Sequence, residues 1–168
     1  MKLSNASLRV WDYGKCFRFY ACEALAAKGV GFVDRPSDLF WNNPMTRIRI
    51  KRVYEAPAPD DGCRVLVDRL WPRGVRRDAL HCDVWARDLA PSAGLRSWYH
   101  ADPGDRWEEF RRRYTDELRA SQAVREFVRG IEGVDTVTLL YASKNAAENH
   151  ALILQEYLQR AAGGATIA

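Results

Sequence analysis

The residues best suited to chemistry gather where an apolar run gives way to an arginine-rich turn, within Arg64–Arg77. Residues 65–67 are all apolar, and an unbroken apolar run is typical of a strand covered on both faces. Asp68 and Arg69 follow this run directly, and Arg73 comes four residues after Arg69. Ligands of open α/β sheets bind beyond the carboxyl ends of strands, and a guanidinium group fits phosphate or carboxylate. We therefore expect Arg69 and Arg73 to bind an anion.

The turn that carries Arg73 has a defined shape. Pro72 removes a backbone donor and disfavours a helical conformation at Trp71, while Gly74 permits conformations that other residues resist. We expect Trp71 and Gly74 to line the site. Two interpretations stay open for Asp68, which either moves a proton or simply pairs with an arginine, and Trp71 could equally serve only in packing.

A second polar cluster follows Val137–Tyr141, an apolar and β-branched run that predicts another strand. Ser143 and Lys144 come after this run, and Asn145 has Glu148 three residues further on, which is the spacing of a capping box. This pattern predicts that Asn145 caps a helix. The N-terminus of such a helix presents free backbone donors and a positive dipole, so it favours an anion.

If both strands are central and parallel, the two polar clusters meet at one edge of the sheet and form an anion pocket. Two alternatives stay open: His150 could be bonded to nearby backbone, and Lys144 could be an ordinary surface lysine. No metal or cofactor is predicted. The predicted site comprises the candidate catalytic residues Asp68 and His150, the anion-binding residues Arg69, Arg73 and Lys144, and the lining residues Trp71, Gly74, Ser143 and Asn149.

The elements that must position these clusters alternate between strands and helices. Alternating apolar and basic residues in Thr46–Val53 predict a half-buried or edge strand, and Glu55–Gly62 is a loop by its Pro, Asp and Gly content. Ser92 is a plausible N-cap for a helix over Ala93–His100. The longest helical pattern is Asp105–Arg129, whose aromatic stripe predicts core packing rather than a ligand site. This alternation favours one α/β domain.

The start of the chain has a different character. Hydrophobic residues are irregularly spaced in residues 1–44, and Phe40–Pro44 resembles a break. We expect residues 1–44 to be a poorly packed N-terminal extension, Met45 to be the natural initiator, and residues 45–168 to form the domain.

Composition limits the class of protein. The chain has 168 residues, 47% hydrophobic and 29% charged, which is the balance of a soluble globular domain. No apolar run approaches the roughly 20 residues of a membrane span, and no secretory signal is recognisable. Four cysteines show neither a CxxC pattern nor zinc-ligand spacing, so a cytoplasmic location without membrane contact is expected.

The positive charge is local rather than general. Arg47–Arg77 holds nine basic residues against four acidic ones, whereas Asp78–Ala168 holds eleven against fourteen. A local excess favours an anion site or a modest basic face over a protein coated for bulk nucleic-acid binding. A solvated charged edge is the alternative. Arg111–Arg113 is interpreted as a solvated face, because acidic neighbours offset it.

A family resemblance rests on several strings together. The chain carries Val-Asp-Arg-Leu-Trp-Pro-Arg-Gly at 67–74, Asp-Leu-Ala-Pro-Ser at 88–92, aromatic residues at 107, 110 and 114, Thr-Leu-Leu-Tyr-Ala-Ser-Lys-Asn at 138–145, and Asn-His at 149–150. In these strings it resembles the YeaO-like bacterial family of domain of unknown function 488 (DUF488), from about Thr46 to Leu158. The resemblance implies a compact α/β domain with a largely parallel sheet and no established activity. A more distant branch carries a Cys-His-Arg string near the second loop. This chain has no cysteine there, which weakens a thiol or sulfur-transfer mechanism.

Three functions remain open. The first is an enzyme acting on a small phosphorylated or carboxylated molecule, although Ser143 has no evident base to make it a nucleophile. The second is a nucleic-acid-associated module with Arg47–Arg52 and Arg69–Arg77 on phosphates and Trp71 available for stacking. The third is a non-catalytic domain that binds a ligand or partner. The sequence does not fix an oligomeric state.

Overall fold

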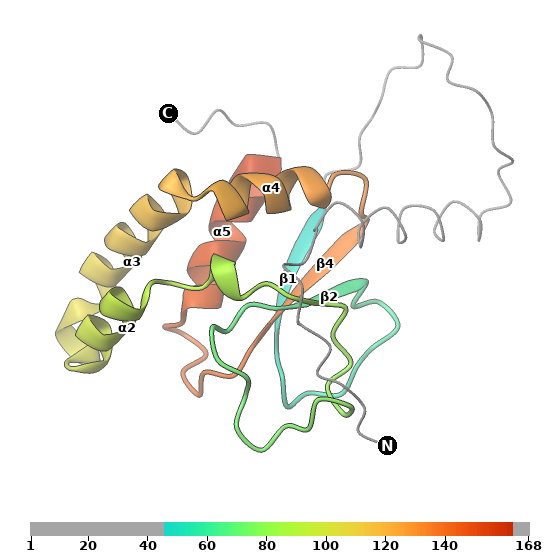
Figure 1. Cartoon of the computed structure of the whole chain (residues 1–168), viewed down its shortest axis with the longest axis horizontal. Helices are drawn as coiled ribbons and strands as arrows, with labels where there is room; N and C mark the ends of the chain where they lie inside the picture. The colour runs from blue at the N-terminus through green and yellow to red at the C-terminus, as the bar shows by residue number, and fades with distance from the viewer. Residues whose placement is uncertain (1–45, 163–168) are drawn as a thin grey trace, which may run out of the picture.

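The computed structural model describes residues 46–162, which build a four-stranded parallel sheet (Figure 1). The strands are β1 (Arg47–Arg52), β2 (Cys63–Leu66), β3 (Val84–Trp85) and β4 (Thr136–Tyr141). Their order is β1-β4-β2-β3, and each of the three strand pairs is parallel. The predicted α/β fold with a largely parallel sheet is therefore confirmed. The expected extension over residues 1–44, and Met45 as initiator, lie outside the described residues.

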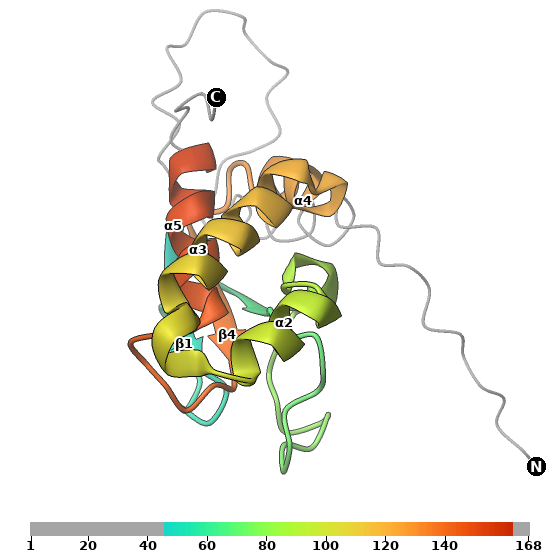
Figure 2. The same cartoon turned by 90° about the vertical axis from the view of Figure 1, so that its left-hand side faces the viewer.

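Helices cover one face of this sheet. They are the 3₁₀ turn η1 (Arg87–Leu89) and the α-helices α2 (Ala93–His100), α3 (Pro103–Ala120), α4 (Gln122–Gly130) and α5 (His150–Ala162), which lie together in Figure 2. Val65 and Val67 of the β2 region and Leu139 of β4 share one buried cluster with the apolar faces of these helices. Because side chains alternate along a strand, the intervening residues must be covered from the other side.

A long loop, rather than a helix, covers the opposite face. Leu66 and Leu140 are fully buried there, together with Leu80, and half-buried Trp71 and Trp85 pack against them. In Figure 1 this green loop lies on the side of the sheet away from α3 and α4. The prediction that residues 65–67 are covered on both faces is confirmed, since all three are fully buried.

The helix predicted over Ala93–His100 has the predicted bounds, whereas the Asp105–Arg129 pattern forms helices with different boundaries. Ser92 caps α2 as expected, its Oγ accepting from the backbone N–H of Leu95 at 3.2 Å. The pattern over Asp105–Arg129 divides into α3 and α4, because Ser121 adopts an extended conformation and its side chain caps α4. The helix also begins earlier than predicted, with Pro103 in its first turn, where a missing backbone N–H costs nothing.

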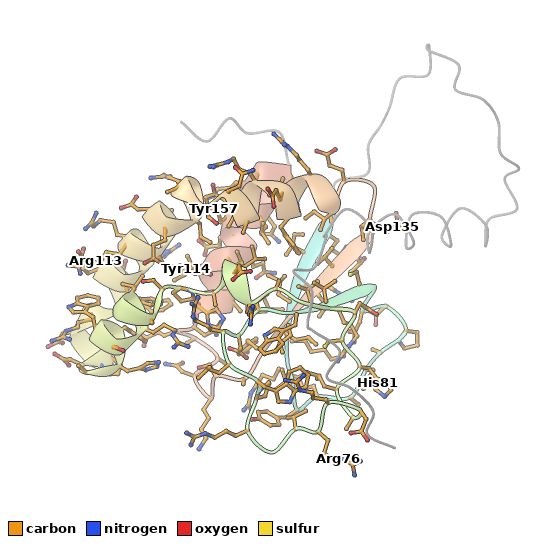
Figure 3. All side chains as sticks on the ribbon, viewed as in Figure 1. Arg76, His81, Arg113, Tyr114, Asp135 and Tyr157 are labelled. Carbon is orange, nitrogen blue, oxygen red and sulfur yellow. The ribbon has the colours of Figure 1, made fainter. Side chains whose placement is uncertain are left out.

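The aromatic stripe of α3 forms core, as predicted. Phe110, Tyr114 and Leu118 are buried, and the Tyr114 hydroxyl donates to the carbonyl oxygen of Leu89 at 2.5 Å. This bond ties α3 to η1. Figure 3 labels Tyr114 on the inner side of α3 and Arg113 on its outer side. Arg113 and Arg112 both pair with Glu109, so the arginine run is a solvated face with acidic neighbours, as expected.

Much of the basic excess of the first strands is neutralised within the fold. Lys51 and Arg64 both bind the buried carboxylate of Asp61, and Arg49 binds Asp60 at 2.7 Å. Asp61 is only 4% exposed, and a buried carboxylate requires such partners. These basic side chains are thereby engaged in the structure of the β1–β2 connection.

The Tyr114 hydrogen bond provides a test of the packing between α3 and η1. Tyr114→Phe should lower the free energy of unfolding by about 1–2 kcal/mol, because the buried carbonyl of Leu89 loses its donor. Urea denaturation measures this change. Tyr157→Phe, the same chemical change at a half-buried position, is the control and should alter the free energy by less than about 0.5 kcal/mol. Equal effects of the two variants would contradict the proposed role of the Tyr114 hydroxyl.

Candidate functional site

A cavity of about 350 Å³ lies at the carboxyl ends of β2 and β4, on the helical side of the sheet. Six of the predicted site residues line it: Asp68, Arg69, Ser143, Lys144, Asn149 and His150. The structure thus brings the two polar clusters, which are some seventy residues apart in sequence, to one place. It follows from the parallel pairing of β2 and β4, whose carboxyl ends lie at the same edge.

Three predicted site residues, Trp71, Arg73 and Gly74, lie outside this lining. The Trp71 side chain packs on the opposite face of the sheet, the face that the long loop covers. Its ring packs edge-on against Trp85 at 5.5 Å, and its indole N–H donates to the carbonyl oxygen of Val75 at 2.7 Å. Of the two interpretations of Trp71, the geometry agrees with packing. Gly74 has a φ of 76°, which explains the need for glycine in this turn. Anion binding by Arg73 remains a prediction, separate from the cavity.

Asp68 connects the two loops that form the cavity. Its Oδ2 accepts from the backbone N–H of Ala142 at 2.7 Å, just beyond β4. Burial raises the pKa of this carboxyl from an ordinary 3.8 to about 6, although the hydrogen bond from Ala142 and the positive charge of Arg96 both oppose the rise. Asp68 is therefore a carboxyl group that titrates near neutral pH and faces a cavity.

His150 is the first residue of α5 and lies beside Asp68. Its Nε2 is 3.2 Å from the carbonyl oxygen of Val67, which is the backbone bond considered from the sequence. Burial lowers the pKa of His150 to about 4, and the charge of Arg96 lowers it further against the opposing effect of the Val67 bond. The imidazole is thus neutral near pH 7, with Nε2–H donating to Val67.

The neutral imidazole decides the nature of the Asp68–His150 contact. Oδ1 of Asp68 and Nε2 of His150 are 3.6 Å apart, a distance that would suit an ion pair only if the imidazole were protonated. Since its pKa lies below that of Asp68, the carboxyl group takes up a proton before the imidazole does. The two polar side chains are therefore close to each other but do not form a salt bridge.

The expected helix cap at Asn145 is wrong. Helix α5 begins at His150, and Asn149 is its cap, with Oδ1 accepting from the backbone N–H of Leu152 at 3.1 Å. The Asn145 side chain instead accepts from the backbone N–H groups of Ala147 and Glu148, which forms a local turn. Asn149 is 4% exposed, so its place in the cavity wall is first a structural one.

Arg96 is the functional candidate that the sequence reasoning missed. It extends from α2 into the cavity wall, and its Nε is buried without a hydrogen-bond partner within residues 46–162. Tyr99 and His100 follow it at i+3 and i+4 and line the same cavity. A cation and two rings on one face of a short helix could have indicated the wall of a site.

The arrangement favours binding and proton transfer over nucleophilic chemistry. The hydroxyl of Ser143 lies 3.5 Å from the carbonyl oxygen of Asn145, and among the described residues no base accepts its proton. Neither Cys63 nor Cys82 lines the cavity. Within the described part of the chain, no group of three or more His, Cys, Asp or Glu is placed to hold a metal ion.

Comparison with known proteins agrees with the family resemblance. Residues 47–165 match the family described as "Inactive DUF488-N3 subclade". The chain belongs to the DUF488 family. Its relatives include an uncharacterized protein of Mycobacterium tuberculosis, 47% identical over 113 residues, which are 67% of this chain and 94% of the relative. The uncharacterized protein YeaO of Escherichia coli is 39% identical over 112 residues, 67% of this chain and 96% of YeaO.

No solved structure matches this DUF488 chain. None of its helices between residues 46 and 162 is both long and apolar enough to cross a membrane.

The opposite pKa shifts of Asp68 and His150 predict opposite pH dependences of stability. Because the pKa of Asp68 is raised, its ionisation destabilises the fold as pH rises from about 4 to above 6. Because the pKa of His150 is lowered, its protonation destabilises the fold as pH falls from about 6.5 to 4. Each effect reaches on the order of 3 kcal/mol, so the two nearly cancel in the native chain.

Replacing either Asp68 or His150 should reveal the pH dependence of stability that the other residue causes. Relative to the native chain, Asp68→Asn should gain stability as pH rises from about 4 to 7, whereas His150→Gln should gain stability as pH falls over the same range. Both replacements retain a polar group that can bond to Ala142 or Val67. Denaturant unfolding at a series of pH values measures the two differences. Parallel curves for the three proteins would refute the assigned pKa shifts.

Proposed function

We propose that this DUF488 domain binds a small anionic molecule, with a phosphate or carboxylate group, in the cavity at the carboxyl ends of β2 and β4. The observation that carries the proposal is Arg96, a half-buried cation of the cavity wall that forms no ion pair among the described residues. A guanidinium group without a carboxylate partner favours an anion beside it.

Two further cations support this proposal. Arg69 and Lys144 line the same cavity, and within residues 46–162 neither forms an ion pair. The acidic residues of the lining are Asp68 and Glu148, so cations outnumber carboxylates even when both are ionised. Protonation of Asp68 enlarges this excess. A site with such a balance favours a negative ligand.

Aromatic side chains in the cavity lining indicate that the ligand also has an organic part. Tyr99 and Phe110 line the cavity, with ring centroids 4.4 Å apart. A cavity of about 350 Å³ exceeds the space that a bare inorganic ion needs, and apolar walls with a few polar groups are typical of small-molecule sites. We expect a cytoplasmic metabolite that combines an anionic group with a flat or apolar body.

Binding is a better proposal than catalysis. The matched family is described as an inactive subclade, and neither a cysteine nor a serine with a base lines the cavity. The second candidate is an enzyme in which Asp68 acts as acid or base, since its pKa of about 6 suits proton transfer near neutral pH. Both functions require the same anion site, and only the second requires chemical change of the ligand.

Calorimetric titration with two probes tests the anion site. Phenyl phosphate should bind more tightly than inorganic phosphate, because its ring can contact Tyr99 and Phe110 while its oxygens reach the cations. Arg96→Gln should weaken phenyl phosphate binding roughly 10- to 100-fold, the effect of losing a charge-assisted hydrogen bond.

Arg113→Gln is the matched control, because it removes the same charge from the outer side of α3, away from the cavity. It should change the affinity by less than about twofold. Equal losses in both variants, or no heat with either probe, would overturn the anion site. Mass spectrometry of the probe after incubation separates the two functions, since release of phenol would favour the enzyme.

A further inference from the structure

Two large hydrophobic side chains are exposed on the described part of the chain, and both lie beside the arginine turn. Tyr54 is 54% exposed and Leu70 is 68% exposed. The Tyr54 hydroxyl donates to the carbonyl oxygen of Arg73 at 3.3 Å, so the segment after β1 and the loop after β2 meet here. Exposed apolar residues gathered in one place mark an interaction surface more often than scattered ones do.

The Tyr54 ring is held by a cation. The guanidinium carbon of Arg52 lies 5.3 Å from the ring centroid, and the buried Nε of Arg52 has no hydrogen-bond partner within residues 46–162. This contact occupies one face of the ring and helps to fix its orientation. More than half of the Tyr54 side chain remains exposed, so a flat group of a bound partner can stack on its ring.

The loop that meets Tyr54 carries two further cations, Arg73 and Arg77. Arg77 lies over both Trp71 and Trp85, 5.4 and 5.8 Å from their centroids, and this packing immobilises its guanidinium group. Neither Arg73 nor Arg77 forms an ion pair within the described chain, whereas Arg76 pairs with Asp78. We define the loop surface as Arg52, Tyr54, Leu70, Arg73 and Arg77. It presents three cations, one exposed ring and one exposed leucine, and none of its arginines is paired with a carboxylate of the described residues.

We propose that the loop surface binds single-stranded nucleic acid, with Arg73 and Arg77 on the phosphates and a base stacked on Tyr54. Unpaired bases can stack on an exposed ring, whereas the bases of a duplex are already stacked on one another. An acidic peptide would satisfy the arginines but offers no comparable partner for the ring. This assignment replaces Trp71, whose indole is engaged by Trp85, Val75 and Arg77.

The loop surface is distinct from the anion cavity. The cavity lies on the helical side, whereas the loop packs through Trp71 and Trp85 on the other face of the sheet. Figure 3 labels Arg76 at the end of this loop, far from Arg113 on the helical side. No residue of the loop surface lines the cavity, so the proposal does not depend on the proposed ligand.

Fluorescence anisotropy with a labelled 20-nucleotide poly-thymidine strand and the full chain tests the proposal. If about three phosphates are neutralised, affinity should fall roughly 10- to 20-fold between 50 and 200 mM salt. The double variant Arg73→Gln, Arg77→Gln should bind at least about tenfold more weakly at 50 mM salt, with a shallower salt dependence. Tyr54→Leu should bind at least about fivefold more weakly with an unchanged salt dependence. Its folding is not in question, because the ring is mostly exposed.

A matched control makes the outcome specific. The double variant Arg112→Gln, Arg113→Gln removes the same charge from α3 and should retain affinity within about twofold. The proposal is overturned if the strand does not bind at 50 mM salt, if Tyr54→Leu binds normally, or if the α3 variant loses as much affinity as the loop variant. It is also overturned if a 20-base-pair duplex binds as tightly, or if poly-glutamate of equal charge displaces the strand.

Discussion

The parallel pairing of β2 with β4 is the constraint on which the other features depend. Val65 faces Leu139 and Leu66 faces Leu140 in this register, and all four are fully buried. A shift by one residue would exchange the faces of these side chains, so packing on both sides fixes the register. Because the two strands are parallel, their carboxyl ends lie at the same edge of the sheet, where the carboxylate of Asp68 accepts from the backbone N–H of Ala142. This bond joins the two loops that line the cavity.

Different segments cover the two faces of the sheet, and this explains why some basic residues lie at the cavity and others lie away from it. Helices cover the face toward which Val65 and Val67 point, and the long loop covers the face of Leu66. Arg69 still lines the cavity on the helical side, but Trp71 has already turned to the other face, and its ring lies against Trp85. Trp85 also donates to the carbonyl oxygen of Asp68 at 2.8 Å, which holds the start of the turn. The arginines beyond Trp71 are therefore carried away from the cavity.

Local sequence patterns predicted the elements, and long-range contacts set the details that those patterns missed. The buried β2 strand, the Ser92 cap and the buried stripe of α3 follow from periodicity and capping rules, which act over a few residues, whereas the parallel sheet was implied by the family resemblance. The start of α5 was misplaced because Asn145 and Asn149 can each accept from backbone N–H groups, and only the tertiary fold selects between them. Arg96 was missed because a helix between two turns gives no sign of the cavity it faces until α5 and the β4 loop are placed.

The Asp68–His150 pair gives the cavity a property that neither residue would have alone. A histidine beside a carboxylate usually gains a proton, but here burial and the charge of Arg96 keep the imidazole neutral. The carboxyl group therefore faces the cavity without a compensating cation on His150, and its own pKa rises to about 6. An anion placed near Asp68 disfavours the ionised form further, so binding of the anion and uptake of a proton by Asp68 must promote each other. The charge of Arg96 acts on both members of the pair and lowers the pKa of each.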